Sequence, residues 1–214
     1  MRPMQLVLAS NNAKKLSELQ VLLAGVAVQL VPQGALGIAE AEEPHITFIE
    51  NALAKARHAA QATGGAALAD DSGVCVDALG GAPGVISAHY APVDLPAADR
   101  EAQRRVQDAA NNARLLQDLQ AFAGPEARRA HFVSTLVAVR HAQDPQPLVA
   151  VGRWPGQILA APQGELGFGY DPLMYIPELG RTVAEMDAAL KNAHSHRARS
   201  VAQMLDLLRE VWLL

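Results

Sequence analysis

The chain has 214 residues, of which 50% are hydrophobic and 19% are charged, and its formal net charge is −4. This length fits a single domain spanning 1–214, with at most two lobes, and the composition excludes a disordered protein. The acidic balance excludes a broad basic face for long nucleic acid, although a small anionic substrate needs only local positive charge.

Short segments of the sequence also argue against a membrane-spanning, a secreted or a zinc-binding protein. No apolar stretch is long enough to span a bilayer, and residues 1–4 lack the layout of a signal peptide. We therefore expect a cytoplasmic protein that binds neither membrane nor nucleic acid. The single cysteine, Cys75, cannot form an internal disulfide, and no Cys/His spacing predicts a zinc site. Its neighbours Val74 and Val76 predict a buried strand thiol rather than a nucleophile.

The first predicted elements are a strand, a helix and a second strand. Residues 5–9 form a short apolar run, which the polar run Ser10-Asn11-Asn12 ends. A helix should follow and end at Gly25, with a second strand at about 26–31. Its apolar face should be made by Leu16, Leu19, Leu22 and Leu23.

The next segment predicts a helix and then a strand. The run from Thr47 to Glu50 has the form of a capping box, so a helix should begin there and run to 63–65, with Lys55 inside it. Residues 66–69 predict a strand that ends at Asp70-Asp71-Ser72-Gly73 and that residues 74–76 could resume.

The second half of the chain mixes helices with paired strands. We expect a helix over about 96–119, a hairpin, a Gly-rich loop over 164–172, a short helix after the capping box at 182–185, and a last helix from Ser195. The hairpin strands should cover 132–140 and 148–153. Hairpin and crossover connections together predict an α/β or α+β class with a mixed sheet.

The first candidate site lies where the first strand passes into a helix. Ser10, Asn12 and Lys15 would direct a hydroxyl, an amide and an ammonium toward one point, beside the free N–H groups of a helix N-terminus. A phosphate is the natural ligand of such a point. The alternative is that Ser10 or Asn12 caps the helix and Lys15 is solvated.

The second candidate site is the acidic pair Asp70-Asp71, which follows apolar residues. Two adjacent carboxylates in this position are costly unless a cation lies beside them. Since adjacent strand residues face opposite ways, one carboxylate can face a ligand while the other orients the loop. Mg²⁺ prefers such hard oxygen ligands, and Glu42 and Glu43 could complete the site. The alternative is an acidic turn before Gly73.

Two further segments have the chemistry to recognise a nucleotide. His196 and Arg197 place positive charge at the positive end of the last helix, where an electron-rich ligand would relieve the repulsion. In the loop Phe168-Gly169-Tyr170-Asp171, an aromatic ring can stack on a base and the carboxylate can accept hydrogen bonds from ring N–H groups. For the loop alone, a structural turn is the alternative.

Taken in order, these motifs resemble the Ham1-like family of inosine/xanthosine triphosphate pyrophosphatases. The matching segments span nearly the whole chain. They are residues 10–15, 42–43, 47–52, 55–57, 69–73, 80–84, 154–156, 167–172 and 195–197.

The resemblance implies an elongated, two-lobed mixed α/β fold with a long mixed central sheet flanked by helices, an active-site cleft between the lobes, and a homodimer. It implies Mg²⁺-dependent hydrolysis of dITP, ITP and XTP or dXTP to the monophosphate and pyrophosphate. The implied catalytic residues are Asp71 as general base, with Asp70, Lys15 and Lys55, and the implied metal ligands are Asp71 with Glu42 or Glu43. The implied substrate-binding residues are Ser10, Asn11, Asn12, Ala13, Lys14, Lys15, Lys55, Ser72, Phe168, Gly169, Tyr170, Asp171, Lys191, His196 and Arg197.

The sequence departs from the family pattern in an enlarged segment at about 93–112, whose role the resemblance does not give. The alternative functions are a Maf-like pyrophosphatase acting on other nucleotides and a nucleotide sensor without catalysis.

Overall fold

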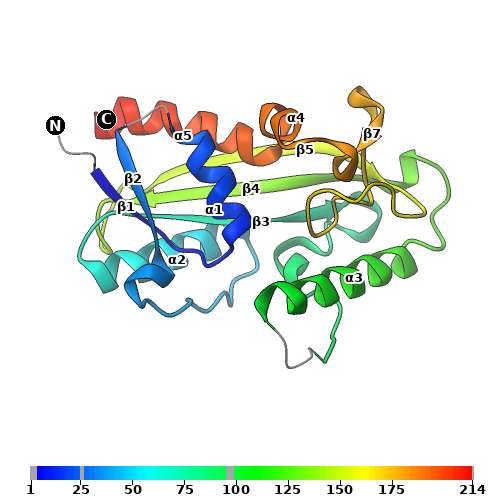
Figure 1. The fold of residues 1–214 in the computed structure, drawn as a ribbon, viewed down its shortest axis with the longest axis horizontal. Coiled ribbons are helices and arrows are strands. Elements are labelled where there is room, and N and C mark those ends of the chain that lie inside the picture. The colour runs from blue at the N-terminus through cyan, green and yellow to red at the C-terminus, as the bar shows by residue number, and fades with distance from the viewer. Residues whose placement is uncertain (1–3, 25–26, 95–98, 214) are drawn as a thin grey trace. The chain divides into compact units, whose positions relative to one another are not determined.

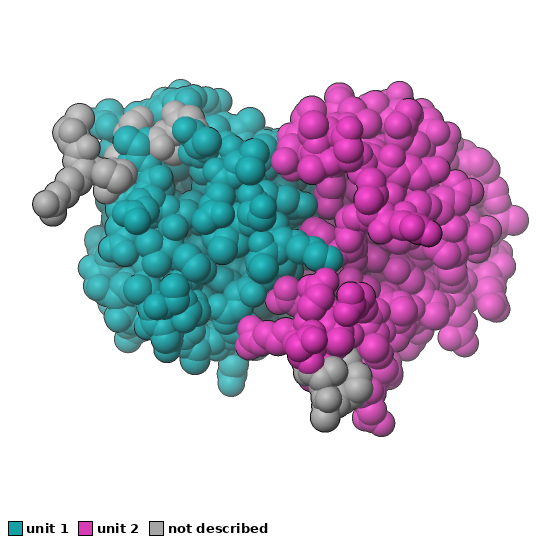
Figure 2. All heavy atoms as spheres, viewed as in Figure 1, with its two compact units in different colours: residues 1–72, 134–153, 195–214 teal, residues 73–133, 154–194 magenta. Residues whose placement is uncertain are grey.

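The computed structural model describes residues 4–24, 27–94 and 99–213. The chain divides into two compact units (Figure 2). Unit 1 contains residues 1–72, 134–153 and 195–214, and unit 2 contains residues 73–133 and 154–194. Both units are therefore assembled from segments that are distant in sequence.

Within the described ranges, seven strands form one sheet in the order β2-β1-β3-β4-β5-β6-β7 (Figure 1). The strands are β1 (Met4–Leu8), β2 (Val28–Pro32), β3 (Ala67–Val76), β4 (Arg129–Val139), β5 (Leu148–Ile158), β6 (Met174–Ile176) and β7 (Arg181–Thr182). β1 pairs in parallel with both β2 and β3, whereas β6 pairs antiparallel with β5 and β7. The predicted mixed α/β class is confirmed.

The α-helices begin close to the predicted signals. They are α1 (Ala13–Leu22), α2 (Phe48–Thr63), α3 (Arg100–Asp118), α4 (Ala188–His194) and α5 (His196–Trp212). The Thr47 side chain accepts a hydrogen bond from the Glu50 N–H and so caps α2, and Ser195 caps α5 in the same way. Short 3₁₀ helices lie at η1 (Gln33–Leu36), η2 (Asp77–Leu79), η3 (Gly84–His89), η4 (Glu126–Arg128), η5 (Pro177–Leu179) and η6 (Val183–Glu185).

Unit 1 is built in three layers, because alternate residues of its strands point to opposite faces. Leu8 and Leu68 belong to a core that includes Leu19 of α1 and Met204 of α5. On the other face, the core is dominated by alanines, including the α2 residues at 52, 56, 59 and 60. Figure 1 shows α5 and α2 on opposite sides of the strands of this unit.

Unit 2 has a hydrophobic core of its own. Leu115 and Leu119, at the end of α3, share it with Trp154, Leu173 and Met174, all nearly or fully buried. Within the described part of the chain, no helix of either unit has the combination of length and apolar character needed to cross a bilayer.

Several local predictions need correction. β3 does not end at Asp70 but continues to Val76, because Asp70 and Asp71 are compensated by cationic side chains. Cys75 is half-buried rather than buried. The helix after Thr182 is a single 3₁₀ turn. The predicted helix end at Gly25, the start of the second strand at residue 26 and the helix start at 96 lie outside the described residues.

Candidate active site

The strand order of unit 1 creates a point where ligands commonly bind. The chain leaves β1 through α1 to reach β2 on one side, and then returns through α2 to β3 on the other side of β1. In α/β sheets, the carboxyl ends of strands at such a switch point form a crevice for ligands. Leu8 pairs with Leu68, so the segment after β1 runs beside Asp70 and Asp71 of β3.

The turn from β1 into α1 is shaped by the polar side chains that sequence analysis selected. The Ser10 hydroxyl accepts a hydrogen bond from the Asn12 N–H at 3.2 Å. The Asn12 side-chain oxygen accepts from the N–H groups of Lys14 at 3.1 Å and Lys15 at 3.2 Å, so Asn12 is the N-cap of α1. Asn12 therefore caps α1, as the alternative interpretation of this segment predicted. The N-terminus of α1, with its partial positive charge, begins directly after this residue.

Asp70 is the centre of a buried ionic cluster. Its Oδ2 lies 2.8 Å from Lys15 Nζ and accepts from the Ser72 hydroxyl at 2.8 Å, and its Oδ1 accepts from Ser134 at 2.8 Å. Burial alone would raise the pKa of Asp70, but the charges of Lys15 and Arg197 outweigh it and hold the pKa well below its usual range. Asp70 is therefore a permanent anion that orients Lys15.

Arg197, the second residue of α5, belongs to the same cluster and is 2% exposed. Its guanidinium is paired with Glu18 and lies 3.7 Å from Asp70, and Nη2 donates to the Ser72 hydroxyl. A side chain at Gly152 would collide with the backbone at the start of α5, so this glycine allows the close approach that buries Arg197. Carboxylates of the chain itself compensate the positive charge at the start of α5, so this charge does not by itself indicate a ligand.

Asp71 faces the other side of β3 and shares one cation with a second carboxylate. Lys55 Nζ donates to Asp71 Oδ1 and to Glu43 Oε2, each at 3.0 Å. Burial of Asp71 is the main cause that raises its pKa to about 6, and repulsion from Glu43 adds to it, although Lys55 acts in the opposite direction. For Lys55, burial lowers the pKa, but the two carboxylates outweigh it and raise the pKa.

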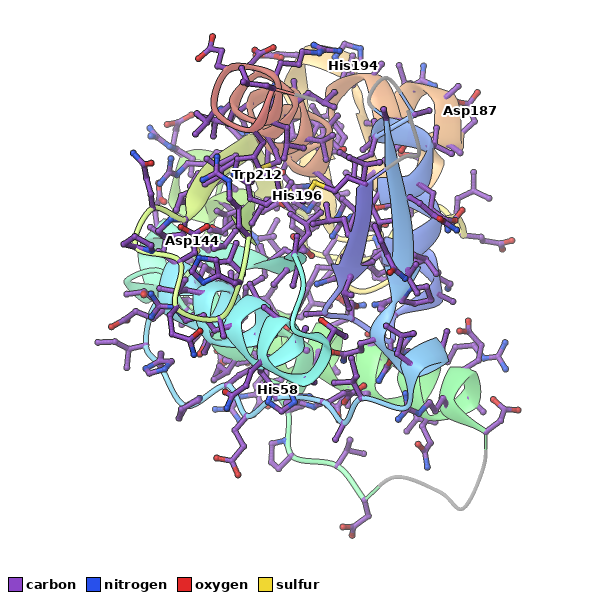
Figure 3. All side chains as sticks on the ribbon, turned by 90° about the vertical axis from the view of Figure 1, so that its left-hand side faces the viewer. His58, Asp144, Asp187, His194, His196 and Trp212 are labelled. Atoms are coloured by element: carbon purple, nitrogen blue, oxygen red, sulfur yellow. The ribbon has the colours of Figure 1, made fainter. Side chains whose placement is uncertain are left out.

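The loop that carries Glu43 is held at several points. The Asn11 side chain donates to Glu40 at 2.8 Å, the Asn51 amide bonds to the backbone of His45, and His58 of α2 lies 3.0 Å from the Ala39 carbonyl (Figure 3). In this structure Asn11 therefore supports the acidic loop. Glu42 and Glu43 are both exposed, and Glu43 forms an ion pair with Lys55.

One carboxylate oxygen of this cluster is placed to bind a metal ion. Asp71 Oδ2 is buried and makes no hydrogen bond within the described residues, although a buried ionised oxygen normally requires a partner. Those residues contain no group of three or more acidic, His or Cys side chains placed to enclose a metal. Mg²⁺ does not require such a group, since one or two carboxylates with water and substrate phosphates suffice. Asp71 and Glu43 are therefore the residues of this cluster that could hold a metal ion.

A second cluster lies in unit 2, around the loop from Gly167 to Asp171. Asp171 Oδ2 accepts from the Phe168 N–H and from Lys191 Nζ, each at 2.9 Å, and Asp171 is 3% exposed. Lys191 Nζ also lies 4.5 Å from the centre of the Phe168 ring. Gly167 has φ +79°, and a Cβ there would lie 2.1 Å from Asp171 Oδ2, so this glycine makes room for the carboxylate. The loop presents a half-buried aromatic ring beside a buried ion pair.

A sequence profile of the Ham1 family matches residues 6–207. The chain belongs to the Ham1 family. It is 70% identical over 210 residues to a dITP/XTP pyrophosphatase of Methylibium petroleiphilum, an alignment that covers 98% of this chain and 100% of the relative. A dITP/XTP pyrophosphatase of Leptothrix cholodnii is 64% identical, with 98% and 99% covered.

Solved structures support the same relationship. A HAM1 protein from Coxiella burnetii matches with a TM-score of 0.85 and 40% identity, and the match covers 97% of this chain and 100% of that one. The Ham1 protein of Staphylococcus aureus matches with a TM-score of 0.80 and 32% identity over 95% of this chain and 97% of that one. The Ham1 fold is therefore shared over almost the full length.

The structure groups the residues that sequence analysis had selected into two clusters. In unit 1 it brings together Lys15, Lys55, Asp70, Asp71, Ser72, Glu43 and Arg197, and in unit 2 it brings together Phe168, Asp171 and Lys191. His196 is buried in the first turn of α5 (Figure 3). Ala13 and Lys14 are exposed at the start of α1, and Gly169 and Tyr170 complete the Phe168 loop.

Two members of the Asp70 cluster in this Ham1 chain, Glu18 and Ser134, were not predicted from the sequence. Glu18 lies on α1 and forms an ion pair with Arg197. Ser134 lies on β4, and its hydroxyl donates a hydrogen bond to Asp70. Ser134 gave a weak signal, because it is a hydroxyl within an apolar strand. Glu18 gave none, since an acidic residue on a helix is usually solvated.

Proposed function

We propose that this protein hydrolyses non-canonical purine nucleoside triphosphates, dITP, ITP and XTP or dXTP, to the monophosphate and pyrophosphate, with Mg²⁺. The observation that carries the proposal is the Asp71 carboxylate, which has one oxygen on Lys55 and the other buried without a partner among the described residues. Such an oxygen suits contact with a metal ion and with the attacking water. The relatives named dITP/XTP pyrophosphatase support the choice of substrate.

Asp71 would act as the general base. A base works best when its pKa lies close to the operating pH, and burial raises the pKa of Asp71 to about 6 in the metal-free protein. The carboxylate is then ionised near neutral pH but remains able to take a proton from water. Water activated in this way would attack the α-phosphorus, so that pyrophosphate leaves.

The cationic side chains of unit 1 would bind the triphosphate. Lys15 and Lys55, together with Ser10, Asn12 and the N-terminus of α1, are the proposed phosphate ligands. These cations already face carboxylates, since Lys15 contacts Asp70 and Lys55 contacts two acids. A further positive charge is needed beside a polyanionic substrate.

Mg²⁺ would supply that charge. We propose Asp71 and Glu43 as its protein ligands, in preference to Glu42, because Glu43 shares Lys55 with Asp71. When bound, the metal would neutralise charge that develops on the phosphates.

We propose that the loop from Phe168 to Asp171 and Lys191 take part in recognition of the base. The Phe168 ring would stack on the purine, and Lys191 and Asp171 would contact its polar edge. By resemblance to the family, Asp171 is assigned to the ring N–H side of the base, and His196 and Arg197 are assigned to its 6-oxo group. Such a site rejects adenine because the 6-amino group would leave buried polar groups unpaired.

The family relationship favours this proposal over a Maf-like pyrophosphatase of other specificity. By resemblance to the family, we also propose that residues 1–214 act as one domain. We further propose that the protein forms a homodimer and is located in the cytoplasm. The ionic cluster at Asp71 favours catalysis over a sensor function.

The decisive experiment offers the purified protein dITP, XTP, dGTP and dTTP with Mg²⁺ and identifies both products by chromatography. We expect dIMP or XMP together with pyrophosphate. Release of orthophosphate would contradict the mechanism, and a preference for dTTP would favour a Maf-like specificity. Binding of dITP without turnover would indicate a sensor.

Two matched variants test the role of Asp71. Asp71→Asn should abolish turnover and leave dITP binding largely intact, because the amide keeps the shape but cannot accept the proton. Asp206→Asn makes the same chemical change on α5, where the side chain is 74% exposed, and should retain full activity. Full activity of Asp71→Asn would exclude Asp71 as the base.

A further inference from the structure

The backbone N–H and C=O of Gly169, in the middle of the proposed base-recognition loop, are both held by one helix. The Gly169 N–H donates to Asp108 Oδ2 at 2.9 Å, and the Asn112 amide donates to the Gly169 carbonyl at 2.9 Å. Asp108 and Asn112 are four residues apart on α3, so they lie one above the other on the same face. An acceptor and a donor on one helix face thus match the donor and acceptor of one loop residue.

The chemistry of Asn112 shows what this side chain contributes. Its Nδ2 donates to the Gly169 carbonyl, while its Oδ1 is buried and accepts no hydrogen bond within the described residues. Burying an amide with half of its polar groups unpaired costs stability. The hydrogen bond from Asn112 to the Gly169 carbonyl therefore explains why this position carries an amide and not an aliphatic side chain.

α3 also contacts the same loop indirectly, through a buried network of hydrogen bonds. Gln107 donates to the Ala91 carbonyl, and Asn111 accepts from the Ala91 N–H and donates to the Ser87 carbonyl. The Ser87 carbonyl also accepts from the Tyr170 hydroxyl at 2.8 Å. Burial raises the pKa of Tyr170 far above its usual range, so this hydroxyl remains a donor. α3 therefore fixes Gly169 directly and Tyr170 through the segment at 87–91.

We propose that Asp108 and Asn112 are positioning residues that set the affinity and selectivity for the purine base. Gly169 follows Phe168 directly and precedes Asp171 by two residues, so a shift of its backbone moves both the stacking ring and the carboxylate. Recognition by a stacked ring and a few hydrogen bonds is sensitive to displacements of about 1 Å. The inference rests on the proposed function, and it gives a role to the enlarged segment at 93–112, part of which forms the start of α3.

The test replaces Asn112 with Asp, which keeps the shape, removes the donor and places a negative charge beside the Gly169 carbonyl. Gln117→Glu is the matched control, because it makes the same charge change at an exposed position of α3. We expect Asn112→Asp to raise KM for dITP by about tenfold and to change kcat by less than about threefold. Asp108→Asn retains an acceptor for the Gly169 N–H and should lose less affinity than Asp108→Ala.

Calorimetric binding of two probes separates positioning from general damage. The probe dIMP carries the base, whereas inorganic tripolyphosphate carries only the phosphates. Asn112→Asp should weaken dIMP by about tenfold and leave tripolyphosphate unchanged. The dIMP-to-dGMP affinity ratio should change as well, because the loop that reads the base has moved.

Two outcomes would overturn the inference. One is dIMP affinity in Asn112→Asp equal to that in Gln117→Glu, and the other is an equal loss for dIMP and tripolyphosphate, which indicates general unfolding. If wild type binds dIMP but does not convert dITP to dIMP and pyrophosphate, the proposed function fails, while the dIMP comparison still decides the role of Asn112.

Discussion

Replacing Asp71 with Asn should alter the pH dependence of stability in the metal-free protein. The pKa of Asp71 is raised from 3.8 to about 6, chiefly by burial. Between these values the folded protein binds a proton that the unfolded chain has released, so the free energy of unfolding falls as the pH rises through this window. Ionised Asp71 is thus a source of instability that is present at neutral pH and absent in acid.

The size of the effect follows from the shift. A difference of about two pKa units corresponds to about 3 kcal/mol over the full titration, of which about 2 kcal/mol falls between about pH 4.5 and 7.5. Asp71→Asn lacks this titration. Its stability relative to wild type should therefore rise by about 2 kcal/mol across that interval, and most of the rise should occur below about pH 7.

Urea unfolding with chelator present, at a series of pH values, measures this difference directly. Asp206→Asn serves as the control, because its side chain is 74% exposed, and its difference from wild type should stay nearly constant. Saturating Mg²⁺ should stabilise wild type more than Asp71→Asn, since the ionised carboxylate is the proposed ligand. A flat difference, or one that favours wild type as the pH rises, would show that Lys55 outweighs burial and would refute the reasoning.

Three other substitutions have defined outcomes. Gly167→Ala places a Cβ 2.1 Å from Asp171 Oδ2 at a residue with φ +79°, so urea unfolding should show a loss of about 1–3 kcal/mol and KM for dITP should rise; unchanged values would mean that the loop adapts without strain. Arg197→Met leaves Asp70 with a reduced counter-charge in a buried site and should cost about 3–5 kcal/mol, and a loss below about 1 kcal/mol would contradict the role given to this cluster. Lys55→Met should lower kcat/KM by about a hundredfold or more in the pyrophosphate-release assay, whereas a small change would remove Lys55 from the catalytic set.

Local signals in the sequence determined much of the secondary structure. The capping residue Thr47 and the glycine at 64 define the two ends of α2, and Ser195 defines the start of α5. Short apolar runs predicted strands at the positions of β1 to β5, whereas the short strands β6 and β7 were not predicted. These features depend on neighbours within a few residues, which is why they can be predicted from sequence.

The two carboxylates of β3 illustrate what local patterns miss. An adjacent acidic pair after an apolar run predicted the end of a strand, but β3 continues through Asp70 and Asp71 to Val76. The strand can continue because Lys15 lies 2.8 Å from Asp70 and Lys55 lies 3.0 Å from Asp71. Those cations come from two helices, and only the packing of α1 and α2 on opposite faces of unit 1 places each beside its acid.

By itself, the sequence determined the mixed α/β class, the family and the residue types of the candidate site. Only the tertiary structure decided how the residues share their charges: Asp70 is a buried anion held by Lys15 and Arg197, and Asp71 has a raised pKa and one buried oxygen without a hydrogen-bond partner in the described chain. The physical reason is that burial and charge–charge distances determine the ionisation of a carboxylate. Both depend on contacts between segments far apart in sequence, as does the hold of α3 on Gly169.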